Sequence, residues 1–145
     1  MVIRPPRGYA EPDMGERWRI GSGAVWEERF GYSRAVKAGP LIFVSGTTAA
    51  DPTGGTPIGG DDIAAQAREC FRRIEVALGE LGSGLGEVVR TRMFVTDMGL
   101  SEAVGLVHGE IFGRQAPAAT MVEVSALISP DLLVEIEVDA VSSSD

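Results

Sequence analysis

The sequence predicts an α+β domain in which two helices cover one face of a single β-sheet. Two segments repeat their apolar residues every three or four positions, which is the period of a helix with one buried face. The segments around them alternate apolar and polar residues, as strands do. Along the chain the elements follow the order β-β-α-β-α-β-β. Because each helix lies in a crossover between strands, both helices are expected on the same face of the sheet.

The N-terminal part is predicted to contain an arm followed by a hairpin. Residues 1–16 are rich in proline, glycine and charge and show no periodicity, so we expect a loose arm. A short strand is predicted over 17–20. Two further strands, over 33–37 and 41–46, flank Ala38-Gly39-Pro40, a turn sequence that predicts a β-hairpin.

Two helices are predicted on either side of a strand over 87–96. The first begins at Asp61 or Asp62, whose carboxylates are good helix N-caps, and ends at Gly82-Ser83-Gly84. Its apolar stripe comprises Ile63, Ala67, Cys70, Ile74, Ala77 and Leu81. The second begins at Asp97 or Ser101, and its buried side comprises Leu100, Ala103, Val104, Val107, Ile111 and Phe112.

The C-terminal third predicts two more strands, over 118–127 and 132–142, joined by the turn sequence Ser129-Pro130-Asp131 and paired with each other. With both helices on one face, the other face of the sheet is left bare. That face carries too much apolar surface to stay in water, with Phe43, Val124, Ile136 or their neighbours on it. Burying it between copies of the chain is the simplest solution, which predicts an oligomer.

Composition limits the possible functions. The 145 residues are enough for one domain, expected over 17–145. Thirteen basic and 21 acidic residues give a net charge of −8, which makes nucleic acid a poor partner. One cysteine and one histidine exclude an intrachain disulfide and a histidine-rich metal site. No segment is typical of a signal peptide or a membrane span, so we expect a cytoplasmic protein with no membrane partner.

Several motifs together resemble one known family. They are Phe43-Val44-Ser45-Gly46, Phe94-Val95-Thr96-Asp97, the run Ala116 to Leu127, and Leu133-Val134-Glu135-Ile136-Glu137-Val138. With the order of the elements, they resemble the RidA (YjgF) family of reactive-intermediate deaminases from about residue 32 to 141. The resemblance implies a chorismate-mutase-like fold in a homotrimer, with the sheets inside and three clefts between subunits. It also implies hydrolysis of enamines and imines without a metal or organic cofactor.

The resemblance assigns a role to each of several residues. Glu135 matches a cleft glutamate that positions and activates water, and a partly apolar cleft raises a carboxyl pKa. Ser45 matches a cleft serine, Tyr32 a hydroxyl donor, and Phe94 an apolar wall, while Thr120 adds a hydroxyl nearby. The residues alone also allow Glu135 to be a solvated edge-strand glutamate and Ser45 to be part of a simple turn. His108 lies mid-helix, where a structural polar role is expected rather than catalysis.

Position 119 departs from the family. The imine deaminases carry an arginine there, whose planar guanidinium binds the substrate carboxylate through two hydrogen bonds. Alanine at this position removes that pair, a loss of about 2–5 kcal/mol in a desolvated site. Ala119 therefore predicts a poor 2-imino acid deaminase. Arg92 and Arg34 are the candidates for a replacement cation, although a solvated or ion-paired role is expected for each.

Three functions remain open at this point. The first is a small-molecule hydrolase that deaminates an enamine, an imine or a related metabolite. The second is a non-catalytic binding or regulatory trimer that retains the pocket. The third, an endoribonuclease, is disfavoured by the net charge and by the lack of a basic stripe.

Overall fold

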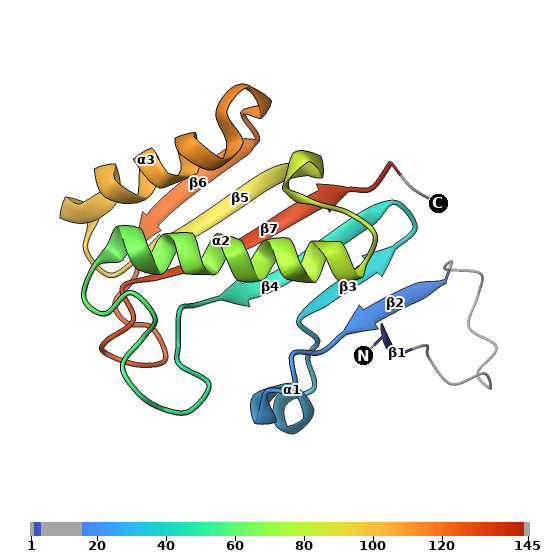
Figure 1. Cartoon of the computed structure of the whole chain (residues 1–145), viewed down its shortest axis with the longest axis horizontal. Coiled ribbons are helices and arrows are strands. Elements are labelled where there is room, and N and C mark those ends of the chain that lie inside the picture. The colour runs from blue at the N-terminus through green and yellow to red at the C-terminus, as the bar shows by residue number, and fades with distance from the viewer. Residues whose placement is uncertain (1, 4–15, 144–145) are drawn as a thin grey trace.

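The computed structural model describes residues 2–3 and 16–143 and contains one mixed seven-stranded sheet (Figure 1). The order across the sheet is β1-β2-β3-β4-β7-β5-β6, and β5–β6 is the parallel pair among these strands. The strands are β1 (Val2–Ile3), β2 (Arg17–Ile20), β3 (Ala35–Ala38), β4 (Leu41–Thr47), β5 (Val88–Val95), β6 (Ala118–Glu123) and β7 (Val134–Val141).

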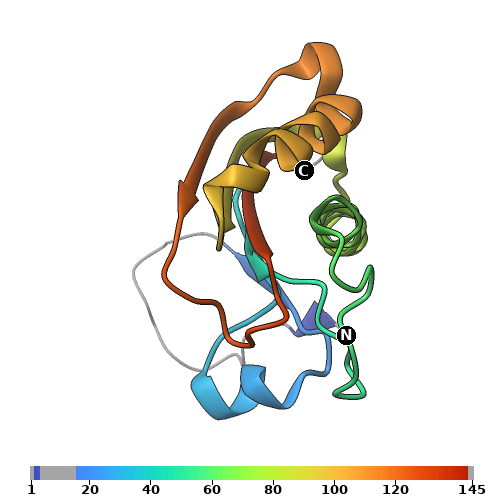
Figure 2. The ribbon, with the colours of Figure 1, turned by 90° about the vertical axis from the view of Figure 1, so that its left-hand side faces the viewer.

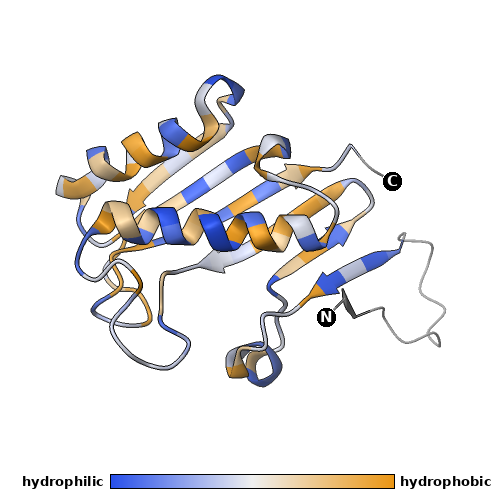
Figure 3. Ribbon diagram, viewed as in Figure 1, coloured by the Kyte–Doolittle hydropathy of each residue, from blue (hydrophilic) through white to orange (hydrophobic). Residues whose placement is uncertain are grey.

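In the described ranges, three α-helices accompany the sheet: α1 (Val25–Phe30), α2 (Ile63–Glu80) and α3 (Ser101–Phe112). The helices α2 and α3 lie on the same side of it, as expected from their places in the crossovers (Figure 2). Hydrophobic and hydrophilic residues interleave along α2 and along the strands behind it (Figure 3). The core lies between these two layers. Its largest fully buried side chains include Phe71, Ile74 and Leu78 from α2 and Ile136 from β7.

The helix starts follow the capping chemistry read from the sequence. The Asp62 carboxylate accepts hydrogen bonds from the amides of Ala64 (2.9 Å) and Ala65 (3.3 Å), so Asp62 is the N-cap of α2. Before α3, the Asp97 carboxylate accepts from Gly99 N (2.8 Å) and opens a short 3₁₀ turn. Helix α3 then begins at Ser101, so both predicted starting points are used in sequence.

Three features differ from the expected arrangement. The last two strands do not pair with each other, because β5 lies between β6 and β7. Strand β6 ends at Glu123 rather than near residue 127, after which the Val124 amide still donates to Val95 O (2.8 Å). Helix α1 was not expected, and its left-handed C-cap at Gly31 (φ 71°) ends it after six residues.

The N-terminal end is only partly described. Strand β1 pairs antiparallel with β2, so at least two residues of the expected arm belong to the sheet. The rest of that arm, apart from Glu16, lies outside the described residues. Strand β2 matches the short strand expected over 17–20.

The second face of the sheet is not covered by α2 or α3. Alternation along β4 and β7 places Phe43, Glu135, Glu137 and Asp139 there, while Ile42 and Val44 are buried beneath the helices. Phe43 is 45 % exposed in the single chain. Burial of this face between copies therefore stays a prediction. Among the described residues, no helix combines the length and hydrophobicity needed to cross a membrane.

Candidate functional site

The site is built around an irregularity at the end of β4. The β4–β7 pairing shifts register between Val44 and Thr47, which leaves Ser45 and Gly46 in a bulge. The Ser45 amide donates to Arg34 O (3.0 Å), and the Ser45 hydroxyl donates to Ser33 O (2.7 Å). The bulge is therefore held from the β3 side. The Ser45 hydroxyl therefore already has a hydrogen-bond partner, the backbone carbonyl of Ser33.

Glu135, the second residue of β7, lies directly against this bulge. A Cβ atom on Gly46 would stand only 3.0 Å from Glu135 Cδ and would overlap the nearer carboxylate oxygen. The carboxylate thus occupies the space that a side chain at position 46 would take. A side chain at position 46 would therefore displace the Glu135 carboxylate, although the backbone there is not left-handed.

The environment of Glu135 favours its protonated form. Partial burial raises the pKa of this carboxyl, the Arg34 guanidinium opposes the shift, and the neighbouring Glu137 carboxylate adds to it. The Glu135 side chain makes no hydrogen bond and no ion pair with the described residues. An unpartnered, half-buried carboxyl with a raised pKa is suited to exchange a proton with a ligand or a water molecule.

Arg34 lies on the other side of Gly46. Its Nη2 donates to the Gly46 carbonyl (2.5 Å), so Gly46 contacts both Arg34 and Glu135. Its Nε is buried and has no hydrogen-bond partner among the described residues. Burial lowers the pKa of Arg34, an effect opposed by Tyr32, Glu27 and Glu135. Arg34 therefore places a positive charge close to the Glu135 carboxyl without forming an ion pair within 4.0 Å.

Arg92, the other candidate cation, is already paired. Its Nη1 lies 3.3 Å from Glu137 Oε1 and 3.3 Å from Asp139 Oδ2. Both acids are neighbours across the β5–β7 ladder, and Asp139 is also 3.9 Å from Arg90 Nε. The charge of Arg92 is thus balanced within the uncovered face of the sheet.

The remaining predicted residues are spread over one end of that face. Phe94 stands opposite Glu135 in the β5–β7 register, and its role as an apolar wall stays a prediction. Tyr32 follows α1 and is 41 % exposed. Its electrostatic interaction with Arg34 opposes the lowering of the Arg34 pKa by burial. Thr120 is opposite Arg92, level with Glu137 rather than with Glu135, and two strands away. A single chain therefore brings Phe94, Arg34 and Glu135 together but leaves Thr120 apart.

Ala119 projects from the other side of the sheet. It pairs with Thr91, a buried residue whose hydroxyl is 2.8 Å from His108 Nε2 on α3. Consecutive residues of a strand point to opposite faces, so Thr120 and not Ala119 shares the face of Arg92. The same contact gives His108 the structural polar role expected from the sequence, and burial lowers the pKa of His108.

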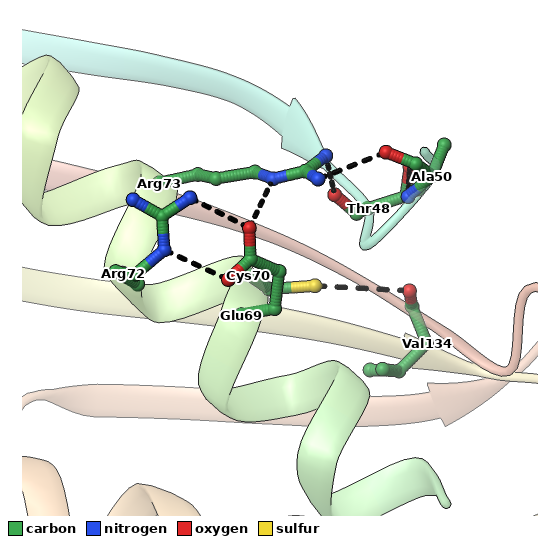
Figure 4. Close-up of polar contacts among 7 residues, drawn as sticks. All are labelled: Thr48, Ala50, Glu69, Cys70, Arg72, Arg73 and Val134. Atoms are coloured by element: carbon green, nitrogen blue, oxygen red, sulfur yellow. Dashed lines mark hydrogen bonds and ion pairs between the residues drawn. The ribbon is translucent and has the colours of Figure 1, made fainter. Parts of the chain in front are cut away.

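Helix α2 supports the site from the covered face (Figure 4). Arg73 donates to Thr48 O (2.8 Å) and Ala50 O (2.8 Å), which follow the bulge, and to Glu69 Oε1 (2.8 Å). The Cys70 thiol lies 4.0 Å from Val134 O, one residue before Glu135, and burial raises its pKa to about 12. Cys70 is consequently a packing residue rather than a nucleophile.

The sequence reading missed Gly46 and the structural importance of Arg34. Gly46 belongs to the motif Phe43-Val44-Ser45-Gly46. Its close approach to the Glu135 carboxylate, however, joins residues 89 positions apart, and no pattern in the neighbouring sequence indicates it. Among the described residues, no group of three or more histidine, cysteine or acidic side chains is placed to hold a metal ion. An open hollow of about 580 Å³ lies where β5 begins and β7 ends, lined by residues such as Glu87, Pro117 and Val141.

Comparison with known proteins identifies the family. The family model described as Endoribonuclease L-PSP matches residues 26–142. A RutC family protein of Pyrococcus horikoshii, PH0854, is 37 % identical over 106 residues, 73 % of this chain and 82 % of the relative. The crystal structure of Rv2704 from Mycobacterium tuberculosis, a member of the YjgF/YER057c/UK114 family, has 52 % identity and a TM-score of 0.78. The match covers 86 % of this chain and 98 % of the Rv2704 chain. The E. coli YjgF gene product has 32 % identity and a TM-score of 0.67, over 76 % of this chain and 87 % of that one. The chain therefore belongs to the RidA/YjgF family.

Proposed function

We propose that this protein is a deaminase-type hydrolase that acts on a small enamine or imine and needs no cofactor. The observation that carries the proposal is the Glu135 carboxyl, half-buried, unpartnered within the described residues, and raised in pKa beside Gly46 and Phe94. Membership of the RidA/YjgF family supports the reaction class.

The proposed reaction converts an imine and water into a carbonyl compound and ammonia. The substrate reacts as its protonated imine. The Glu135 carboxylate takes a proton from water as the water oxygen bonds to the imine carbon, and the C=N π electrons move onto nitrogen, which gives a neutral carbinolamine. Glu135 then returns its proton to the carbinolamine nitrogen. As the C–N bond breaks and the C=O bond forms, the carbinolamine hydroxyl gives its proton to the Glu135 carboxylate, which passes it to the departing ammonia, so that nitrogen leaves as ammonium. An enamine enters the same sequence after protonation at carbon.

Two other predicted residues have smaller parts in this proposal. The Ser45 hydroxyl donates its hydrogen to Ser33 O, so its oxygen stays free to accept a hydrogen bond from a ligand. The Tyr32 hydroxyl is a candidate donor from the exposed rim. Within its own chain Ala119 lies on the face of the sheet opposite Glu135. The weak activity toward 2-imino acids that we propose therefore concerns a position 119 supplied by β6 of a neighbouring subunit, where alanine brings no guanidinium.

We also propose that the working form is a homotrimer with a ligand cleft between subunits. The support is the uncovered face, which holds Phe43 in the open, and the edge strand β6, which carries Thr120. A neighbouring subunit would then bring its own β6 toward Glu135. Light scattering should return three times the chain mass of 15.3 kDa; a monomer at micromolar concentration would contradict this assembly.

The hydrolase proposal is tested by ammonia release. Imines are generated in place by an amine oxidase acting on a panel of amines and ω-amino acids, with an amino-acid oxidase supplying 2-imino acids for comparison, and ammonia release is followed with and without the protein. We expect acceleration by the wild type for at least one imine and none by Glu135→Gln, with Glu137→Gln as the matched control. Equal release by wild type and Glu135→Gln for every imine would refute the role of Glu135.

One observation favours a second candidate, a binding trimer without catalysis. The Ser45 hydroxyl is committed as a donor to the backbone, so it cannot also protonate a leaving group in that state. A binding protein would show saturable ligand binding with no ammonia release by any variant. The family model's description also names an endoribonuclease, and incubation with RNA tests that activity separately.

A further inference from the structure

We infer that Arg34 is the anion-binding residue of this site and that the ligand carries a carboxylate or a similar anionic group. The inference rests on the proposed function, because it names the chemical class of ligand taken beside Glu135. It assigns the missing cation of position 119 to a different strand and a different direction.

The Arg34 guanidinium has hydrogen-bond donors that the described residues leave without partners. Arginine has five N–H donors and stays charged, so buried donors without partners are unfavourable. Of the guanidinium nitrogens of Arg34, only Nη2 forms a hydrogen bond with the described residues, to Gly46 O, and the Nε–H is buried and unpartnered. Nη1 also lacks a hydrogen bond but is not among the buried unpartnered atoms. Nη1 is therefore the donor accessible to a ligand.

Among the described residues, no carboxylate forms an ion pair with Arg34. Glu27 is occupied by Ser22, whose hydroxyl donates to it at 2.6 Å and whose amide donates to both oxygens at 3.0 Å. Glu135 acts on the charge of Arg34 but forms no ion pair with it within 4.0 Å. A half-buried guanidinium without an ion pair attracts an anionic ligand strongly, because the surroundings screen its charge poorly.

Arg92 and the other arginines in this region already have partners. Arg92 has two carboxylates at 3.3 Å, from Glu137 and Asp139, so a ligand would have to displace an existing pair. Arg73 is committed to Glu69 and to two backbone carbonyls, and Arg72 is committed to Glu69. Against the part of the chain that the structure describes, Arg34 is the arginine near Glu135 that forms no ion pair.

The geometry also limits what Arg34 can do. Because Nε is buried and Nη2 already donates one N–H to Gly46 O, the side-on pair of donors formed by Nε and Nη2 is closed to a ligand, and Nη1 is the nitrogen with both N–H groups free among the described residues. A single charge-assisted hydrogen bond is weaker than a bidentate one. The preferred ligand is thus a small imine or enamine whose anionic group reaches Arg34 from Glu135, and affinity for 2-imino acids stays modest.

The test compares two nearly isosteric probes, pyruvate and pyruvamide, by calorimetry with the full chain. We expect the wild type to bind pyruvate about tenfold more tightly than pyruvamide, the contribution of one charged hydrogen bond. Arg34→Met should remove this preference. Arg92→Gln, and the surface control Arg68→Gln, should retain it. Equal binding of the two probes by the wild type, or a preference that survives in Arg34→Met, would overturn the inference.

Two further measurements keep the outcome clear. In the wild type, the ¹H–¹⁵N signal of the Arg34 side chain should shift with pyruvate and not with pyruvamide, which tests the contact even if Arg34→Met does not fold. An unchanged signal would overturn the inference. Glu135→Gln should keep the preference for pyruvate while losing ammonia release, so loss of turnover in that variant bears on the proposed reaction and not on Arg34.

Discussion

The Glu135 carboxylate fills the space that a side chain on Gly46 would occupy, although the two residues belong to different strands. The bulge in β4 makes this possible, since it opens the pairing with β7 between Val44 and Thr47. The same glycine offers its carbonyl to Arg34. Gly46 therefore contacts both the Glu135 carboxylate and the Arg34 guanidinium.

Gly46→Ala should disable the site while leaving the fold intact. The new methyl group would meet the end of a flexible side chain, so the free energy of unfolding should change by less than about 1 kcal/mol. Displacing the carboxylate should lower turnover on the order of 10²-fold. Thermal melting and ammonia release measure the two effects. In a Glu135→Ala background the same substitution should cause no further loss, and an independent loss there would disprove the steric link.

Arg73→Met should destabilise the protein from the covered face. It leaves the carbonyls of Thr48 and Ala50 without their guanidinium donors, at a cost of about 1–3 kcal/mol. Arg72→Met is the matched control, because Arg72 is exposed and bonds only to Glu69 among the described residues. Its cost should stay within about 0–1 kcal/mol. Urea unfolding of both variants measures the difference, and equal costs would contradict this role of Arg73.

His108 should make stability fall in mild acid. Burial lowers its pKa below the ordinary 6.5, so the unfolded chain binds a proton at a pH where the folded protein does not. Its contribution is present above pH 6.5 and is lost as the pH falls through the lowered value. His108→Gln should therefore show a smaller drop in melting temperature than the wild type between neutral pH and pH 5. Parallel curves for the two proteins would show that His108 does not titrate in this way.

Local patterns were enough to predict most of the fold. The three- and four-residue periodicity predicted α2 and α3, and the Asp62 carboxylate predicted where α2 begins. Strand order was harder, because β5 enters between β6 and β7 through contacts that sequence spacing does not encode. A run of polar and apolar residues also looks the same for strand β6 and for the bend after Glu123.

The candidate site was predictable where a residue type carries its own chemistry. Glu135 stood out as an acid in an apolar strand, and its raised pKa has the expected cause, burial. The contact with Gly46 and the free donor of Arg34 depend on the β4 bulge. A bulge moves a backbone by one residue without a distinctive sequence, so neither could be read from the chain alone.

The pH dependence of turnover tests the role of Glu135 most directly. As the base, Glu135 must be ionised in the free enzyme, so kcat/KM should fall as the pH drops through its pKa, which lies above the ordinary 4.5. The measurement is ammonia release from the best imine of the panel, corrected for the uncatalysed reaction, for the wild type and Glu135→Gln. We expect kcat/KM of the wild type to show an acid limb above pH 4.5, and kcat/KM of Glu135→Gln to be low and independent of pH. The same acid limb and the same rates in both proteins would contradict it.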